Sequence, residues 1–585
     1  MLPAMRTLLV TLHSKYIHGS LALPYLAAYC GAAAGELRLL EFTVHEPKES
    51  VLAALLAQQP DVVAFSVYLW NRRETLDLID ALTAAAPKLR TVIGGPEVCF
   101  EGPELFARHP GLTALVRGEG EIPLRGLLSA WHQGQDPEGV PRLLWRQGLT
   151  LQEGPDAPPL AELDQIPSPF ALGLVALDRG LVYYETSRGC PYTCAFCMSA
   201  LDPLVRSFSK ARIEADLRLL LAARVPLIKL VDRTFNYDAA RAREIFGFLL
   251  QQEGESRVHF EIGAHLLDQA TLELLAQAPK GRFQFEIGVQ STLSQTLERI
   301  GRKASLERLE TNVRQLVAQG NIHLHLDLIA GLPGEGFDDS LNAIDRVLAL
   351  RPNHLQLEPV KLLPGSPLRQ QADQLGLRFD PNPPYAILST PTLSWQELDR
   401  LRGISRLLDL TWNSGCFDGF LGGMLQNWGA LSQALASIQA HWQQAGLFRH
   451  PLSRAGVFAA IADWVRSHCR PDQSAPLLEL LGRDYARCER VVPGKVPDFL
   501  DRPLTEAEME AVRQRVQAET QALKGLGLKL QYFAAPFFTL PGGSSRQVRL
   551  FLYLTRSGAG MEVREITLPP PQGSVPATTF PNPTA

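Results

Sequence analysis

Short strand-like runs alternate with helix-like runs up to Val360, and this alternation restricts the fold more than any other feature. In the first part of the chain, strand-like runs begin at Arg6, Val62, Thr91 and Thr113, with helical stretches such as 21–30 and 73–85 between them. Strands spaced by helices form parallel sheets, because a parallel connection needs a crossover that a helix can fill. We therefore predict an α/β chain that opens with a Rossmann-like, doubly wound domain over residues 1–150.

The carboxyl ends of these strands carry glycine and aromatic residues. The segments are Tyr68 with Trp70, then Gly94-Gly95-Pro96, then Gly118-Glu119-Gly120-Glu121. Open parallel sheets bind ligands beyond the carboxyl ends of their strands. Glycine lets the backbone approach a large flat ligand, and aromatic rings offer it apolar surface. A binding face and ordinary loop glycines explain these residues equally well from this pattern alone.

A proline-rich stretch over residues 151–178 predicts a linker. The alternation then resumes with six strand-like runs. These runs are Leu181–Thr186, Leu227–Val231, Val258–Ile262, Phe283–Ile287, His323–Ile329 and His354–Val360. Six βα units predict a partial barrel over residues 179–390, with its chemistry at the C-terminal mouth by analogy with the eight-unit barrel.

The pattern changes after residue 390. Thr505 and Glu508 form a capping box that opens a helix, and residues 529–540 and 547–555 are typical of a β-hairpin around Pro541-Gly542-Gly543-Ser544. We predict a mainly helical C-terminal domain with a terminal β-hairpin over residues 391–567. The proline-rich tail over residues 568–585 is predicted to be disordered.

Composition and charge exclude several classes of protein. The net charge is −4 and 46% of the residues are hydrophobic, which excludes a disordered chain and one that binds nucleic acid by bulk positive charge. No apolar run reaches the ~18 residues of a membrane span, and the first ten residues do not form a signal peptide. We expect a cytoplasmic protein with no membrane and no nucleic-acid partner.

Three of the eight cysteines lie close together, as Cys190, Cys194 and Cys197 in the spacing Cys-x-x-x-Cys-x-x-Cys. Thiolates at this spacing can hold three irons of a 4Fe-4S cubane, and the lack of a fourth cysteine leaves one iron open to a ligand. A structural zinc site is the main alternative, but it needs a fourth ligand, and no other Cys or His lies beside this loop. Cluster thiolates need a reducing compartment, which agrees with a cytoplasmic protein.

A three-cysteine loop at the end of the first strand of a partial barrel resembles the radical S-adenosylmethionine (SAM) superfamily. Later phrases of the chain follow in the order typical of that family, at residues 230–236, 285–291, 327–335 and 362–366. The resemblance implies that the open iron binds SAM and that its reductive cleavage gives a 5′-deoxyadenosyl radical. It also implies SAM contacts from Phe196, Asp232, Glu286 and Gln290.

The domain before the barrel resembles the cobalamin-binding domain of the cobalamin-dependent branch of that superfamily. The cobalamin contacts that this resemblance implies are Tyr68, Gly94, Gly95, Gly118, Glu119 and Gly120. The signature Asp-x-His-x-x-Gly, whose histidine is a lower ligand of cobalt, is replaced around His18 by Tyr-Ile-His-Gly-Ser-Leu. We therefore assign no axial ligand to cobalt, and we expect His13 and His18 to be ordinary loop residues. The C-terminal part resembles an accessory domain of unknown function.

The resemblance predicts a cobalamin-dependent radical SAM enzyme with a 4Fe-4S cluster, SAM and cobalamin as cofactors. Its leading reaction is C-methyl transfer to an unidentified small-molecule or peptide substrate, with flavodoxin or ferredoxin as electron donor. Two alternatives stay open. One is a ring-forming or rearranging radical SAM enzyme in which cobalamin relays an electron or is absent, and the other is a non-catalytic iron–sulfur module with a redox or structural role.

Polar residues near the predicted strand ends are candidate proton or substrate handlers, although none can be assigned a catalytic role. They are Tyr184, Asp232, Glu286, His323, His325, Glu358 and Lys361. We expect a structural role for most of them, and Lys361 could simply pair with Glu358.

Overall fold

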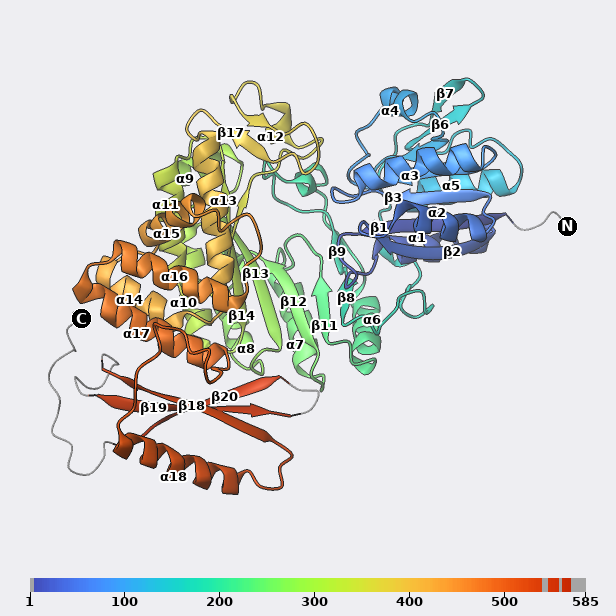
Figure 1. The fold of residues 1–585 in the computed structure, drawn as a ribbon. Coiled ribbons are helices and arrows are strands. Elements are labelled where there is room, and N and C mark those ends of the chain that lie inside the picture. The colour runs from blue at the N-terminus through green and yellow to red at the C-terminus, as the bar shows by residue number, and fades with distance from the viewer. Residues whose placement is uncertain (1–4, 539–545, 557–559, 570–585) are drawn as a thin grey trace. The chain divides into compact units, whose positions relative to one another are not determined.

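The computed structural model describes residues 5–538, 546–556 and 560–569. Figure 1 shows these residues as a ribbon coloured along the chain. The chain divides into two compact units. The first consists of Met1–Gly336, Leu350–Pro352 and Glu358–Leu398, and the second of Phe337–Ala349, Asn353–Leu357 and Asp399–Ala585.

The first unit opens with a seven-stranded sheet in the order β2-β1-β3-β4-β5-β6-β7, which we call the sheet domain. Its strands are β1 (Arg6–His13), β2 (Glu36–Thr43), β3 (Val62–Ser66), β4 (Arg90–Gly94), β5 (Ala114–Val116), β6 (Leu143–Gln147) and β7 (Thr150–Glu153). Strands β1 to β5 are parallel, whereas β6 and β7 are antiparallel at one edge. The doubly wound class is confirmed. The strand predictions lacked β2, β6 and β7, and β7 overlaps the stretch that we predicted as a linker.

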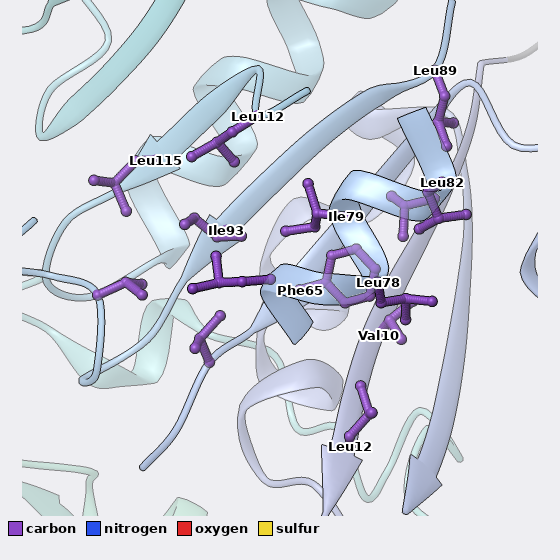
Figure 2. Close-up of a cluster of buried hydrophobic side chains, with 14 of the residues drawn as sticks. Val10, Leu12, Phe65, Leu78, Ile79, Leu82, Leu89, Ile93, Leu112 and Leu115 are labelled. Atoms are coloured by element: carbon purple, nitrogen blue, oxygen red, sulfur yellow. The ribbon is translucent and has the colours of Figure 1, made fainter. Parts of the chain in front are cut away.

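Helices cover both faces of the sheet domain. They are α1 (Ala22–Cys30), α2 (Lys48–Ala57), α3 (Arg72–Ala85), α4 (Pro103–Arg108) and α5 (Glu121–His132). Successive side chains of a strand point to opposite faces, so Val10 joins one buried cluster and Leu9 the other. Figure 2 shows the cluster on the α3 side, where Phe65 of β3 lies among Val10 and Leu78. The two clusters bury both faces, as a parallel sheet requires.

The partial barrel is a six-stranded sheet in the order β15-β14-β13-β12-β11-β8. Its strands are β8 (Leu181–Tyr184), β11 (Leu227–Leu230), β12 (Arg257–Ile262), β13 (Phe283–Gln290), β14 (His323–Ala330) and β15 (His354–Pro359), and its connecting helices include α6 (Lys210–Ala222), α7 (Ala239–Leu250), α8 (Gln269–Leu275), α9 (Ser294–Arg299) and α10 (Leu306–Gln319). The spatial order equals the chain order, and each of the six predicted runs matches one strand. The prediction of a six-unit partial barrel is confirmed.

Short elements complete the first unit. They are a ribbon of β9 (Ser187–Arg188) and β10 (Arg206–Ser207), the helix α12 (Pro367–Gln370), and a second ribbon of β16 (Arg378–Phe379) and β17 (Ile387–Ser389). The first ribbon is antiparallel and pairs Arg206 with Arg188. It brackets the cysteine loop, because that loop lies between its two strands in the sequence.

The barrel strands alternate buried apolar and half-buried polar side chains, most clearly along β13. Phe283 and Phe285 pack with Phe246 of α7, whereas the side chains of Glu286 and Gln290 lie on the other face. An alternation of period two gives each strand one apolar and one polar face. The polar face of the barrel sheet therefore carries the side chains available for chemistry.

The second unit is mainly helical and ends in a small sheet. Its elements are α11 (Phe337–Leu348), most of α13 (Trp395–Leu410), α14 (Asp418–Trp428), α15 (Ser432–Gln444), α16 (Arg454–His468), α17 (Pro471–Cys488), α18 (Glu506–Ala522), β18 (Lys529–Phe537), β19 (Gln547–Thr555) and β20 (Met561–Thr567). The capping box of Thr505 and Glu508 opens α18 as predicted. The predicted hairpin is part of a three-stranded antiparallel sheet, because β20 also pairs with β19. Among the described helices, none has the length and apolar character to span a bilayer.

The turn predicted at Pro541-Gly542-Gly543-Ser544 lies outside the described residues, as does the tail from residue 570. The prediction of a disordered tail therefore stays a prediction. Only Leu568 and Pro569 of that predicted segment belong to the described part of the chain.

We predict that Phe65→Ala destabilises the sheet domain by about 3–5 kcal/mol, because Phe65 is only 3% exposed and its removal leaves a cavity between β3 and α3. Chemical denaturation followed by circular dichroism measures this change. Leu149→Ala is the matched control, since Leu149 is fully exposed in the same domain and its loss should cost less than about 0.5 kcal/mol. Equal losses in the two variants would contradict the proposed core.

Candidate active site

The cysteine loop follows the ribbon strand β9 and is held by backbone hydrogen bonds from three directions. Cys190 donates its N–H to the carbonyl of Asp202 at 2.9 Å, and Ala195 donates its N–H to the carbonyl of Ile300 at 2.8 Å. Leu368 in turn donates its N–H to the carbonyl of Ala195 at 2.8 Å. The loop is therefore anchored to the segments after it, after α9 and at α12.

The three thiols of the loop differ in their surroundings. Cys190 and Cys194 are buried and Cys197 is half-buried. The Sγ of Cys190 lies 3.7 Å from Thr234 Oγ1, and that of Cys194 lies 3.7 Å from Arg302 Nη1. Burial raises the pKa of Cys194, and the charge of Arg302 opposes this rise. Arg302 is thus placed to stabilise the thiolate form that a metal needs.

These thiols fit an iron–sulfur cluster by the chemistry of the donor set. All eight cysteines lie in the described part of the chain and are free, so no disulfide occupies the loop. Within the described residues, no three His, Cys, Asp or Glu side chains surround one metal position. In a cubane, by contrast, each thiolate binds an iron of its own, and soft thiolates are the ligands that such clusters take.

A cavity opens beside the cysteine loop. Thr234 and Arg302 line it and also contact the sulfurs of Cys190 and Cys194. The strand ends contribute polar side chains to the same cavity, namely Glu261 of β12, Glu286 and Gln290 of β13, and Asp327 of β14. The cavity therefore lies between the loop and the carboxyl ends of the central strands, where a barrel keeps its active site.

Two glutamates in this cavity, Glu286 of β13 and Glu261 of the neighbouring β12, differ in their pKa values. Burial raises the pKa of Glu286, but His259 Nε2 at 3.1 Å and Lys229 Nζ at 3.4 Å outweigh this effect and lower it to about 2. Glu261 lies opposite Glu286 in the strand register. Burial, and then the charge of Glu286, raise the pKa of Glu261 to about 7. Glu286 is therefore ionised at neutral pH, while Glu261 exchanges a proton there.

The predicted SAM residues occupy different places. Glu286 and Gln290 line the cavity, and Gln290 has φ +69° at the point where the register of β13 and β14 shifts. Phe196 is half-buried on the cysteine loop. Asp232 is buried and accepts hydrogen bonds from the hydroxyls of Thr186 and Ser187, and from the N–H of Thr186 at 3.0 Å. Asp232 therefore fixes the segment that leads into the loop. The SAM contacts of all four residues stay predictions.

Most of the other polar residues that we considered as candidates for proton transfer or substrate binding contact other residues of the protein. Lys361 Nζ lies 3.5 Å from Glu358 Oε2, so the pairing suggested by the sequence is present. His325 Nε2 lies 3.1 Å from Asp327 Oδ1 at the cavity. The ring of Tyr184 is buried and packs edge-on against Phe170. His323 is exposed at the beginning of β14, at the opposite end of the strand from the cavity.

The predicted cobalamin face of the sheet domain is formed by tight turns and an aromatic pair. Tyr68 and Trp70 stack with their ring centroids 4.6 Å apart and their planes within 4°. Gly95 has φ +115°, and a Cβ there would lie 2.5 Å from the carbonyl oxygen of Val67. Gly118 also has a positive φ, of +71°. These two turns need glycine whether or not a ligand approaches them.

Two further residues of this face contact other parts of the first unit. Glu119 Oε2 lies 3.0 Å from Arg206 Nη1 and 3.4 Å from Arg188 Nη1, so its carboxylate is bound to arginines that flank the cysteine loop. A Cβ on Gly120 would lie 2.9 Å from the tip of the Leu26 side chain, so Gly120 packs closely against α1. Contacts with cobalamin stay predictions for all six residues, namely Tyr68, Gly94, Gly95, Gly118, Glu119 and Gly120.

The two histidines before α1 also have protein partners. His18 Nδ1 lies 2.8 Å from the hydroxyl of Tyr183 on β8, and His13 Nε2 lies 3.3 Å from Glu41 on β2. His18 lies in a loop as expected, whereas His13 is the buried last residue of β1, so the expectation of a loop residue is wrong for His13.

Several residues of the cavity were missed in the sequence analysis. They are Tyr192, Arg233, Glu261, His265, Arg302 and Lys303. One signal was available for Glu261, because it alternates with apolar residues at the carboxyl end of a predicted barrel strand. Arg302 and Lys303 follow the short helix α9, and no local pattern links that position to a cysteine loop far earlier in the sequence.

Three family models match separate parts of the chain. Residues 7–128 match the B12 binding domain, residues 184–347 the radical SAM superfamily, and residues 373–532 a protein family of unknown function, DUF4080. The chain contains a B12-binding domain and a radical SAM domain. A radical SAM domain implies a 4Fe-4S cluster and SAM, and a B12-binding domain implies cobalamin.

Two curated methyltransferases are similar in sequence to part of this chain. The cobalamin-dependent radical SAM methyltransferase TokK of Streptomyces tokunonensis is 31% identical over 351 residues, which is 56% of this chain and 51% of TokK. The 2-(S-pantetheinyl)-carbapenam-3-carboxylate methyltransferase of Streptantibioticus cattleyicolor is 30% identical, with the same coverage of both chains. This chain thus spans about half the length of these curated relatives.

A solved structure shares the fold. The radical SAM methyltransferase TsrM of Kitasatospora setae, with cobalamin and a [4Fe-4S] cluster bound, superposes with a TM-score of 0.55 at 19% identity. The match covers 65% of this chain and 78% of TsrM. It supports the fold, a doubly wound sheet domain followed by a partial barrel.

We predict that Glu261→Gln stabilises the protein at pH 8 by up to about 3 kcal/mol and has almost no effect at pH 4.5. The folded pKa of about 7 lies above the ordinary value of 4.5, so the folded state loses stability as pH rises between these values. Glutamine resembles the protonated form and removes that loss. Chemical denaturation at the two pH values measures the difference.

The control for this prediction is Glu273→Gln, which changes an exposed glutamate on α8. It should show no pH-dependent gain. A gain for Glu261→Gln of the same size at both pH values would contradict the raised pKa.

Proposed function

We propose that this chain is a cobalamin-dependent radical SAM enzyme that transfers a methyl group to a carbon atom of a small-molecule or peptide substrate. The observation that carries the proposal is the set of three free thiols beside a charged cavity, in a chain that also contains a B12-binding domain. The names of its relatives support methyl transfer. A flavodoxin or ferredoxin would supply the electron.

When bound, the cluster and SAM supply a 5′-deoxyadenosyl radical and cobalamin supplies a methyl group. Cys190, Cys194 and Cys197 would each hold one iron. Arg302 offsets the negative charge of the thiolates, because its Nη1 lies 3.7 Å from Cys194 Sγ. Thr234 lies at the cavity side of Cys190, with its Oγ1 3.7 Å from the Cys190 sulfur.

The cavity has charges of both signs, which suits a ligand that is itself a zwitterion. Arg302 and Lys303 lie on the loop side, and the ionised Glu286 lies on the strand side. An α-amino acid group such as that of SAM presents an ammonium and a carboxylate, and each finds an opposite charge in this cavity. We assign the ammonium to the Glu286 side.

A neutral aromatic pair forms another part of the cavity wall. Burial and the charges of Arg302 and Arg308 lower the pKa of His265 to about 4, so its ring is uncharged at neutral pH. Tyr192 hydroxyl lies 3.4 Å from His265 Nε2 and their rings are edge to face. This pair offers an uncharged surface on which a planar group can pack.

We predict that Cys194→Ala lowers 5′-deoxyadenosine release by more than about a hundredfold, because the cluster loses one of its three thiolates. Anaerobically reconstituted protein with dithionite and SAM is assayed by chromatography, with iron content measured in parallel. Cys469→Ala is the matched control, since Cys469 is a half-buried cysteine at the end of α16 and should retain full output. Nucleoside release by Cys194→Ala at the wild-type rate would refute the assignment.

The type of reaction is tested with SAM that carries a labelled methyl group, in the presence of cobalamin and a cell extract as the source of substrate. Label in a new carbon-bound methyl product supports methyl transfer. Release of 5′-deoxyadenosine with an unlabelled, altered product would replace methyl transfer by ring formation or rearrangement. A bound cluster with no nucleoside release would identify a non-catalytic iron–sulfur module.

A further inference from the structure

Two arginines lie directly opposite each other on the ribbon that brackets the cysteine loop. Strands β9 and β10 pair Arg188 with Arg206 in register. Their side chains are only 15% and 4% exposed. Like charges opposite each other destabilise a strand pair, and burial prevents water from screening them. The ribbon therefore depends on anionic partners.

The sheet domain supplies two of these partners. Glu121 Oε1 lies 2.8 Å from Arg188 Nη1, and Glu119 Oε2 lies 3.0 Å from Arg206 Nη1. Both glutamates come from the start of α5 and the turn before it. We call Glu119, Glu121, Arg188 and Arg206 the glutamate–arginine clamp. Charge-assisted pairs with the forked guanidinium group are directional, so the clamp fixes the position of the ribbon as well as its charge.

The ribbon also has local anionic partners. Glu185 Oε1 lies 2.7 Å from Arg188 Nη2, and Asp202 Oδ2 lies 2.8 Å from Arg206 Nη2. These contacts lie within four residues of the arginines along the chain. They hold the ribbon together, whereas Glu119 and Glu121 tie it to a different domain.

Both arginines of the clamp are connected to the backbone of Cys190, the first cysteine of the loop. Arg188 is followed by Gly189 and then Cys190, so its position sets where the loop begins. Arg206 pairs with the carboxylate of Asp202, whose backbone carbonyl accepts the N–H of Cys190 at 2.9 Å. Gly189 has φ +90°, and a Cβ there would lie 2.3 Å from the carbonyl oxygen of Leu204. The backbone around Cys190 is therefore packed tightly against the segment that Arg206 holds.

We propose that Glu119 and Glu121 are positioning residues for the cysteine loop. Through Arg188 and Arg206 they make the position of the Cys190 thiol depend on the sheet domain. This gives the Gly118–Glu121 turn a role in coupling the B12-binding domain to the radical SAM domain. The positioning of Cys190 rests on contacts in the protein alone, and its consequence for a cluster rests on the proposed function.

The direct test is hydrogen–deuterium exchange of the protein without cofactors. Glu121→Gln removes one charge from the clamp with little change in shape, and we expect exchange of a peptide covering residues 188–199 to become about tenfold faster. Glu153→Gln is the matched control, because Glu153 pairs with Arg117 within the sheet domain and is 61% exposed. Exchange of residues 188–199 in the control should equal that of the wild type.

Arg188→Lys separates the charge of this residue from its geometry. Lysine keeps the positive charge but cannot form the forked contacts, so we expect exchange between that of the wild type and that of Arg188→Gln. If Glu121→Gln leaves residues 188–199 unchanged, or accelerates β1 and β3 to the same extent, the proposal is overturned. If Glu121→Gln does not fold, Glu119→Gln provides the same test at the more exposed carboxylate of the clamp.

A second readout follows the cluster itself by electron paramagnetic resonance of the reduced, reconstituted protein. We expect Glu121→Gln to change the g-values or lower the signal per protein, with Glu153→Gln matching the wild type. An identical spectrum in Glu121→Gln would overturn the proposed effect on the cluster. A wild-type protein that binds no cluster, yet shows the exchange effect, would refute the proposed function and leave the positioning role intact.

Discussion

Parallel pairing of the barrel strands is the constraint on which the site depends. It places the carboxyl ends of β11 to β14 at one edge, so that side chains more than 60 residues apart in the sequence, such as Glu261 and Asp327, line the same cavity. The same pairing puts polar side chains side by side on one face. Charges brought so close need compensation, and Lys229 and His259 provide it for Glu286.

The strands of the barrel were predictable because each is a short apolar run with helical signals on both sides. The cysteine spacing was equally local, since the loop holds all three thiols within eight positions. Strand β2 was missed because none of its residues is fully buried and it carries charged residues among its apolar ones. Strand β20 was missed for a similar reason, because it is mostly exposed and polar.

The roles of Asp232 and Glu119 could not be predicted from local patterns, because their partners lie 46 and 87 positions away. Both residues lie in sequence motifs typical of the family, and this suggested that each contacts a cofactor. In the structure each carboxylate is bound to groups next to the cysteine loop, Asp232 to Thr186 and Ser187, and Glu119 to Arg206. A buried carboxylate needs partners wherever it lies, so its presence near a site does not show which ligand it contacts.

The same reasoning applies to the turn from Gly118 to Glu121, whose side chains also have partners within the protein. The positive φ of Gly118 accounts for that glycine, and the pairs with Arg206 and Arg188 account for Glu119 and Glu121. Three of the four residues thus have a reason to be present that involves no cofactor. The support for cobalamin therefore comes from the sheet fold and its family match, while this turn supports contact between the two domains.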